Sequence, residues 1–380
     1  MMKVTDFDRF LAEFKNTKYW ADMAATVEDS PWHREANVAA HTEMVMQQFR
    51  ENFMDKYTEV EQVIGLTALL FHDTGKPTAE ETLEKKDGSG TYRRYAGHEQ
   101  DSAVAFQQLY VSMPELQQLL PSYTARAVRW MIEHHLPYGL KHEEKRRGLA
   151  IGTREALAEA GASYDLFFDC LRSDAAGRVS DGHEQKLQDV EDWIAEFRTV
   201  DTQVNLEECD HTMFLLIGPS GSGKSTWILQ RFGAGDSIIS LDEMRIAFFR
   251  TSVDKEVQDP VEEYRQAWEY ANEHKSLFNT FCTPKFTAAF ETAKTGYGHV
   301  FIDLVNGSKK KRQQWVDLAK KYKFNVVAIE FWNTLDTLID RQSTRGDKAV
   351  PAAAVRQHLY STQAAWLGTE AAEVWVEIGS

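Results

Sequence analysis

The sequence predicts a two-domain protein in which an all-α domain is followed by an α/β domain with a parallel sheet. Apolar residues recur at helical spacing through most of residues 1–204. From about residue 212 onward, short apolar segments alternate with helical ones, which is typical of parallel strands buried on both faces. A glycine-rich loop follows the first of these segments. The 380 residues are enough for two full cores, and we place the boundary near Asn205, giving domains 1–204 and 205–380.

The first domain is expected to consist of helices joined by short connections. Polar, glycine-containing residues at 85–90 predict a turn between two short polar arms. A further helix is expected over roughly 184–198, inside an acidic linker at 181–211. The apolar spacing places the main helices at 5–15, 38–54, 59–71, 101–120, 124–136 and 163–171.

Residue types that bind metal ions lie within or at the ends of these helices. The pair His72-Asp73 follows the apolar run 64–71, and burying both polar groups requires a compensating interaction. A lone histidine of this kind is more often a structural residue than a ligand. Together, imidazole and carboxylate groups suit a catalytic divalent ion with open positions for water and phosphate. The remaining candidates are His41, His98, His134, His135 and Asp174.

The order of these residues resembles that of the HD phosphohydrolase superfamily, most closely in segments 69–77 and 97–99. The resemblance covers about residues 30–180. It implies transition-metal divalent ions such as Mn, Ni, Co, Zn or Fe, and it places Lys76 near the scissile phosphate. A first ion would be held by His41, His72, Asp73 and Asp174. A second ion, if present, would be held by Asp73, His98 and His134, with His135 as the alternative to His134. His33 and Arg34 are candidates for substrate contact or for an ordinary surface role.

Residues 218–226 fit the phosphate-binding loop pattern. The apolar run 213–217 precedes the loop, and residues 227–232 can form a helix whose N-terminus faces an anion. This order of strand, loop and helix disfavours a simple serine-glycine linker. Lys224 would reach the β- and γ-phosphates and Ser225 would bind Mg²⁺, so we expect Mg²⁺ with ATP or GTP. The expected NTP contacts are Gly218, Ser220, Gly221, Ser222, Gly223, Lys224, Ser225 and Thr226.

Further buried strands are expected at 237–241, 299–302 and 325–331, with helices over Val261–Thr295 and Ser308–Tyr322. Asp242 follows the first of these strands, at the edge where open α/β sheets bind ligands. It could accept the proton of an attacking hydroxyl group or simply cap a helix.

Three arginines lie near the expected phosphate site. Arg245 is one helical turn after Asp242 and can hold an incoming phosphate. Arg341 and Arg345 form an i, i+4 pair that could close over the triphosphate or could belong to a solvated helix face.

Residues 212–362 resemble the phage polynucleotide 5′-kinase family, in the loop and its Thr226-Trp227, in segment 242–245, and most specifically in segment 341–351. The resemblance implies Asp242 as general base and Lys224 and Ser225 on the donor phosphates. Arg245 would hold the acceptor phosphate, and Arg341 and Arg345 would clamp the donor. Asp303 and Asn306 resemble an acceptor-binding segment of the family, but with different spacing. Aromatic residues of the insert 252–296 could stack on a terminal base, although most are expected to pack in the core.

Together the two halves resemble bifunctional RNA end-healing enzymes. The resemblance implies a polynucleotide 5′-hydroxyl kinase joined to a metal-dependent 2′,3′-phosphatase. The expected partners are an NTP, nucleic-acid termini of RNA or DNA, and a separate RNA ligase that acts downstream. The alternatives are a small-molecule kinase fused to an HD nucleotidase and an NTP-driven switch.

Composition limits these choices. The net charge of −15 lies mostly in the first half, so an extended basic track for nucleic acid is not expected. Any polynucleotide would therefore be held near its end. No apolar run approaches a membrane span, no secretory signal is visible, and the three cysteines are far apart. We therefore expect a reducing cytoplasm, and the family resemblance implies that of a bacterium or a phage-infected host.

Overall fold

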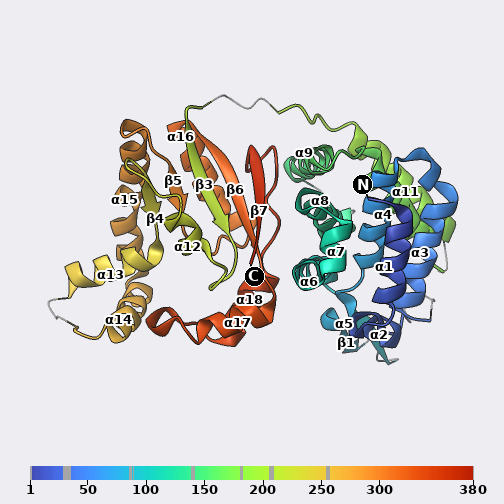
Figure 1. Ribbon diagram of the computed structural model, residues 1–380, viewed down its shortest axis with the longest axis horizontal. Coiled ribbons are helices and arrows are strands. Elements are labelled where there is room, and N and C mark those ends of the chain that lie inside the picture. Colours follow the sequence, from blue (N-terminus) through green and yellow to red (C-terminus); the bar gives the residue numbers. More distant parts are fainter. Residues whose placement is uncertain are drawn as a thin grey trace. The chain divides into compact units, whose positions relative to one another are not determined.

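The computed structural model describes residues 2–28, 36–84, 88, 90–137, 142–179, 183–204, 209–253 and 257–379. The chain divides into two compact units, Met1–Val204 and Asn205–Ser380. The first unit is helical, and the second is an α/β unit with a parallel five-stranded sheet (Figure 1). The predicted fold class is therefore confirmed. His33, Arg34 and most of the expected turn at 85–90 lie outside the described residues.

The first unit also contains a short antiparallel hairpin, β1 (Glu81–Glu84) and β2 (Thr91–Arg94). The helix expected over 101–120 is divided into α6 and α7 at Met113, because Pro114 can begin a helix but cannot continue one. Sequence spacing did not predict α2, α5 or α9. The helices are α1 (Val4–Phe14), α2 (Lys18–Ala25), α3 (Val38–Asn52), α4 (Glu59–Phe71), α5 (Lys76–Ala79), α6 (His98–Ser112), α7 (Pro114–Leu119), α8 (Ser122–Glu133), α9 (Glu143–Glu159), α10 (Asp165–Ala176) and α11 (His183–Arg198), with a 3-10 turn, η1 (Met54–Lys56).

Helix α4 is the central element of the first unit. Thr58 and Glu61 form a capping box that fixes its start, and every side chain from Val63 to Phe71 is buried. Helices α1, α3, α8 and α10 all pack against it. A helix that is apolar on all sides must be enclosed in this way. As a result, the residues that follow α4 lie inside the unit instead of on its surface.

The second unit is built on a parallel sheet with strand order β4-β5-β3-β6-β7. The strands are β3 (His211–Ile217), β4 (Ser237–Ile239), β5 (Val300–Ile302), β6 (Phe324–Trp332) and β7 (Glu373–Ile378). The first four agree with the predicted strands to within a few residues. The sequence analysis did not predict β7, whose polar and apolar residues alternate at the edge of the sheet.

Alternate residues of β3 enter two separate cores, as the twofold period of a strand requires. Met213, Leu215 and Ile217 pack with Phe290 of α15 and Trp315 of α16. Leu216 packs with α12 on the opposite face. The helices are α12 (Lys224–Leu229), α13 (Leu241–Ser252), α14 (Pro260–Glu273), α15 (Lys275–Thr295), α16 (Lys309–Tyr322), α17 (Leu335–Gln342) and α18 (Ala352–Tyr360), with a 3-10 turn, η3 (Gly346–Lys348).

The helical region expected over Val261–Thr295 is two helices, because the backbone leaves helical geometry at His274. Aromatic residues of this region pack mainly among themselves. Phe248 of α13 contacts the rings of Tyr270, Phe278 and Phe281. Core packing is therefore the main use of these rings, as the sequence analysis anticipated.

Candidate functional site

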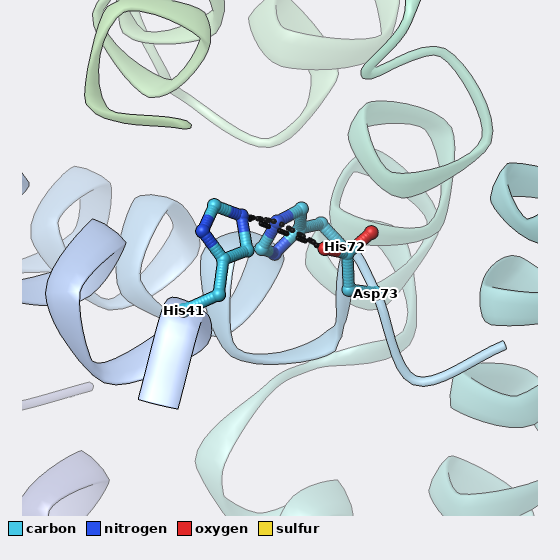
Figure 2. Close-up of side chains that lie close together, drawn as sticks. All are labelled: His41, His72 and Asp73. Carbon is cyan, nitrogen blue, oxygen red and sulfur yellow. Dashed lines mark hydrogen bonds and ion pairs between the residues drawn. The ribbon is translucent and has the colours of Figure 1, made fainter. Parts of the chain in front are cut away.

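The first candidate site is a buried group of two histidines and two aspartates at the centre of the helical unit. His41 comes from α3, His72 and Asp73 follow α4, and Asp174 comes from α10. His41 Nε2 lies 3.1 Å from Asp174 Oδ1, and His72 Nε2 lies 3.2 Å from Asp73 Oδ2. The two Nε2 atoms are 3.4 Å apart, and Figure 2 shows His41 and His72 converging with Asp73. The four residues expected to hold the first metal ion are thus brought together.

Asp73 also belongs to a second group with His98 and His135. Its Oδ1 atom lies 3.1 Å from His98 Nε2 and 3.7 Å from His135 Nε2. The two imidazole Nε2 atoms are 3.2 Å apart. Asp73 therefore offers one oxygen to each group of histidines. Asp73 could therefore help to hold an ion in either group.

The position of His134 corrects the sequence analysis, which placed His134 in this second group and kept His135 as the alternative. His134 Nδ1 donates to the Trp130 carbonyl at 2.9 Å, and its ring stacks on the indole with centroids 4.1 Å apart. Helix α8 ends at Glu133, and His135, two residues after the end of the helix, lies with its Nε2 atom 3.7 Å from Asp73 Oδ1. Spacing in the sequence cannot distinguish two adjacent histidines. Assigning His135 to this group therefore required the course of the backbone after α8.

Backbone carbonyls orient three of these imidazoles. The Nδ1 atoms of His72, His98 and His135 contact the carbonyl oxygens of Leu69, Tyr95 and Ile132 at 2.6, 2.7 and 2.7 Å. Because a carbonyl only accepts hydrogen bonds, each Nδ1 must carry the proton. The Nε2 atoms then point into the site, which is the arrangement that metal-binding histidines use.

Two cationic side chains also contact the aspartates of this site. Lys76 Nζ lies 2.8 Å from Asp73 Oδ2 and 2.6 Å from Glu28 Oε1, and all three side chains are buried. Arg178 Nη2 lies 2.5 Å from Asp174 Oδ2. Lys76 was expected near the site, whereas Glu28 and Arg178 were missed because neither belongs to a recognisable pattern. The site thus combines anionic ligands with cations that could contact a phosphate.

Burial and charge shift the pKa values of these groups strongly. Burial alone would raise the pKa of Asp73, but His72 and Lys76 hold it well below its usual range. Burial would lower the pKa of His72, yet Asp73 and Asp174 raise it to about 10. Burial, together with the nearby His98 and His72, lowers the pKa of His135 to about 3. Ionised carboxylates and converging imidazole nitrogens suit a divalent transition-metal ion, so the residues fit the expected cofactor.

The second candidate site is the loop between β3 and α12 in the α/β unit. Gly221 and Gly223 have φ angles of +85° and +100°, a backbone conformation that residues other than glycine rarely adopt. The buried Lys224 Nζ donates to the carbonyls of Gly218 and Pro219 at 2.8 and 2.7 Å. Burial lowers its pKa to about 8. The lysine is thus held at the loop where a triphosphate would be cradled.

Two arginines of the segment after β6 converge on this loop. Arg341 Nη1 donates to the Gly221 carbonyl at 3.0 Å, and Arg345 Nη1 donates to Ser220 Oγ at 2.6 Å. Gln342, between them, donates to the Ser220 carbonyl at 3.2 Å. These contacts favour the lid over the alternative of a solvated helix face.

Asp242 lies in the first turn of α13, and its carboxylate is shared by two donors. Arg245 Nη1 and Tyr264 Oη donate to Asp242 Oδ1 at 2.6 and 3.0 Å. The N-cap position of α13 is Ser240, so the capping role considered for Asp242 is not the one it adopts. Besides burial, the charge of Arg345 lowers the pKa of Lys224, whereas the charges of Asp303 and Asp242 raise it.

The structure changes the interpretation of Asp303 and Asn306. Ser225 Oγ donates to Asp303 Oδ2 at 2.8 Å, so Asp303 faces the hydroxyl group expected to bind Mg²⁺. Asn306 is buried and its amide donates to the Leu216 carbonyl at 2.8 Å. We therefore no longer expect Asn306 to bind the acceptor, because its amide is used to hold the loop after β5. Thr226 lies exposed in the first turn of α12.

Comparison with known proteins supports part of this description. A family model described as an AAA domain matches residues 213–365. The match supports a P-loop nucleotide-binding domain of the kinase type. It lies entirely within the second unit, contains the phosphate loop, Asp242, Arg341 and Arg345, and does not extend to the histidine-aspartate site. No curated protein shows a significant match to the chain. None of the helices in the described residues combines the length and apolar character that crossing a membrane requires.

Proposed function

We propose that the protein repairs RNA ends. Its second unit would phosphorylate 5′-hydroxyl ends with an NTP and Mg²⁺. Its first unit would remove 2′,3′-cyclic or terminal 2′- or 3′-phosphates at a metal centre. The observation that supports this most strongly is that the first unit has a buried histidine-aspartate site suited to divalent ions and the second has a phosphate-binding loop. A separate ligase would then join the repaired ends.

Acceptor-facing groups favour a kinase over an NTP-driven switch. Among the described residues, the hydrogen bonds to Asp242 involve Oδ1, which leaves Oδ2 to accept the proton of the attacking hydroxyl group. The new O–P bond would form to the γ-phosphorus as the bond to the β-phosphate oxygen breaks, releasing a nucleoside diphosphate. Arg341 and Arg345 would stabilise charge on the transferring group. A nucleotide switch needs no base at this position.

The first unit supports the second activity through the residues that surround its metal ligands. A divalent ion bound by His41, His72, Asp73 and Asp174 would polarise a phosphoryl oxygen and lower the pKa of bound water. Lys76 and Arg178 already lie beside the two carboxylates, and their charges would orient an anionic phosphate.

One observation favours a different acceptor. The net charge of −15 is unusual for a protein that binds nucleic acid, and a small-molecule kinase fused to an HD nucleotidase would not need a basic surface. A competition experiment distinguishes the two proposals. Added nucleosides should inhibit oligonucleotide phosphorylation only weakly if polynucleotide ends are the substrate. Strong inhibition by a nucleoside would favour the small-molecule kinase.

End-group analysis tests the proposal directly. An oligoribonucleotide with a 5′-hydroxyl and a 2′,3′-cyclic phosphate would be incubated with ATP, Mg²⁺ and a transition-metal ion. The wild type should convert both ends, Lys224→Ala only the 3′ end, and Asp73→Ala only the 5′ end. If the wild type converts neither end, or if either substitution abolishes both conversions, the proposal is wrong.

A further inference from the structure

Helix α14 places a tyrosine against the proposed acceptor site. Tyr264 Oη donates to Asp242 Oδ1 at 3.0 Å, and the charges of Arg245 and Arg345 also act on Tyr264. The helix packs against both α13, which carries Asp242, and η3, which follows the lid arginines. Burial and the nearby carboxylate raise the pKa of Tyr264 to about 12, so its hydroxyl group stays protonated and donates at neutral pH.

An exposed tryptophan lies one helical turn farther along the same helix. Trp268 is four residues after Tyr264, so the two side chains are neighbours on one side of α14. Its side chain is 50% exposed, whereas Ala267 and Ala271 on the adjoining face are buried. Most aromatic side chains of this region pack against one another, as Phe248 and Phe278 do, but Trp268 keeps half of its surface open.

Trp268 lies one helical turn, about 5.4 Å along the helix axis, from the tyrosine that contacts Asp242. An aromatic ring is therefore exposed near the carboxylate at which the 5′-hydroxyl group of a terminal nucleotide would bind. Aromatic side chains bind nucleotide bases by stacking, which is tolerant of sequence because every base has a flat face. A stacking contact of this kind also needs no basic groove, which agrees with the acidic composition of the chain.

We infer that α14 forms one wall of the acceptor site, where Trp268 stacks on the base of the 5′-terminal nucleotide and Tyr264 positions the Asp242 carboxylate. The inference rests on the proposed kinase function and deepens it, because it names the part of the acceptor that is recognised. Trp268 is a specificity-determining residue that contacts the substrate. Tyr264 is a positioning residue that acts through Asp242.

Steady-state kinetics with two matched acceptors test this inference. One is a 5′-hydroxyl oligonucleotide, and the other is the same oligonucleotide with an abasic 5′-terminal residue. For the wild type, removing the base should raise KM about 5- to 150-fold, the range expected for loss of one stacked base. Trp268→Ala should raise KM for the normal acceptor by a similar factor and leave KM for the abasic acceptor unchanged. Trp268→Phe should keep KM for the normal acceptor close to that of the wild type, because a phenylalanine ring can also stack on the base.

Further variants separate the two roles. Tyr264→Phe should lower kcat about five-fold with little change in KM, because it removes one hydrogen bond to the Asp242 carboxylate, the proposed general base. Trp375→Ala is the matched control, because Trp375 is 43% exposed on β7 and should leave both acceptors unaffected. Melting curves of each variant identify any that fail to fold.

The outcomes distinguish the inference from the function on which it rests. If the wild type transfers no phosphate to the normal acceptor, the proposed function itself is wrong. If the wild type is active but treats both acceptors alike, the stacking role is refuted without any mutant. An equal rise in KM for both acceptors in Trp268→Ala would also refute it, because a structural defect does not depend on the base.

Discussion

Breaking the buried ion pair between Arg312 and Glu370 should strongly destabilise the α/β unit. The two side chains are 0% and 2% exposed, and Arg312 Nη2 lies 2.8 Å from Glu370 Oε2. Arg312 Nη1 also donates to the carbonyls of Asn306 and Gln363 at 3.2 and 3.0 Å. The pair therefore holds the loop after β5, which begins with Asp303, against the segment before β7.

We expect Glu370→Ala to destabilise this unit by about 3–5 kcal/mol, because it leaves a buried guanidinium group without its counter-charge. For a unit of this size that corresponds to a fall in melting temperature of about 6–20 °C. Glu370→Gln should cost less, since its amide oxygen can still accept one hydrogen bond.

Calorimetry of the full chain measures this effect. The unfolding transition of the α/β unit is the one whose melting temperature rises when ATP and Mg²⁺ are added, because a ligand stabilises the unit that binds it. Glu262→Ala removes an exposed partner of Arg265 in the same unit and should hardly move that transition. If Glu370→Ala also leaves it unmoved, the reasoning about the buried pair is refuted.

Three further predictions concern the candidate sites. His135→Ala should lower the metal content of the protein, whereas His134→Ala should not; equal losses would contradict the assignment of His135. Metal uptake at neutral pH should release protons, because the pKa of His72 is about 10 before an ion binds; calorimetric heats that are identical in buffers of different ionisation enthalpy would argue against this. Nucleotide affinity should fall as pH rises through about 8, because Lys224 then loses the charge that binds phosphate. Lys224→Arg should flatten this pH dependence, and an unchanged profile would count against the role of the lysine.

The sequence predicted the α/β unit well where burial is strongest. Segments such as 213–217 and 326–329 are continuously apolar because central parallel strands are buried on both faces. The edge strand β7 was missed for the same reason. Its side chains alternate between buried Val374 and exposed Glu373 and Trp375, so no continuous apolar run marks it.

The candidate sites were predictable where a motif fixes the chemistry. The phosphate loop and the His72-Asp73 pair are local in sequence, and their residue types allow few other uses. Contacts between distant segments could not be predicted in this way. Glu28 reaches Lys76 across 48 positions, and Tyr264 reaches Asp242 across 22, through folding that no local pattern encodes.

The contacts of Lys76 and Arg178 bear on whether the helical unit needs a metal ion in order to fold. Small zinc domains commonly stay unfolded until the ion arrives, because their ligands repel or remain unsatisfied without it. In this unit the ammonium and guanidinium groups already neutralise the two aspartates. We therefore expect the helical unit to fold without a bound ion.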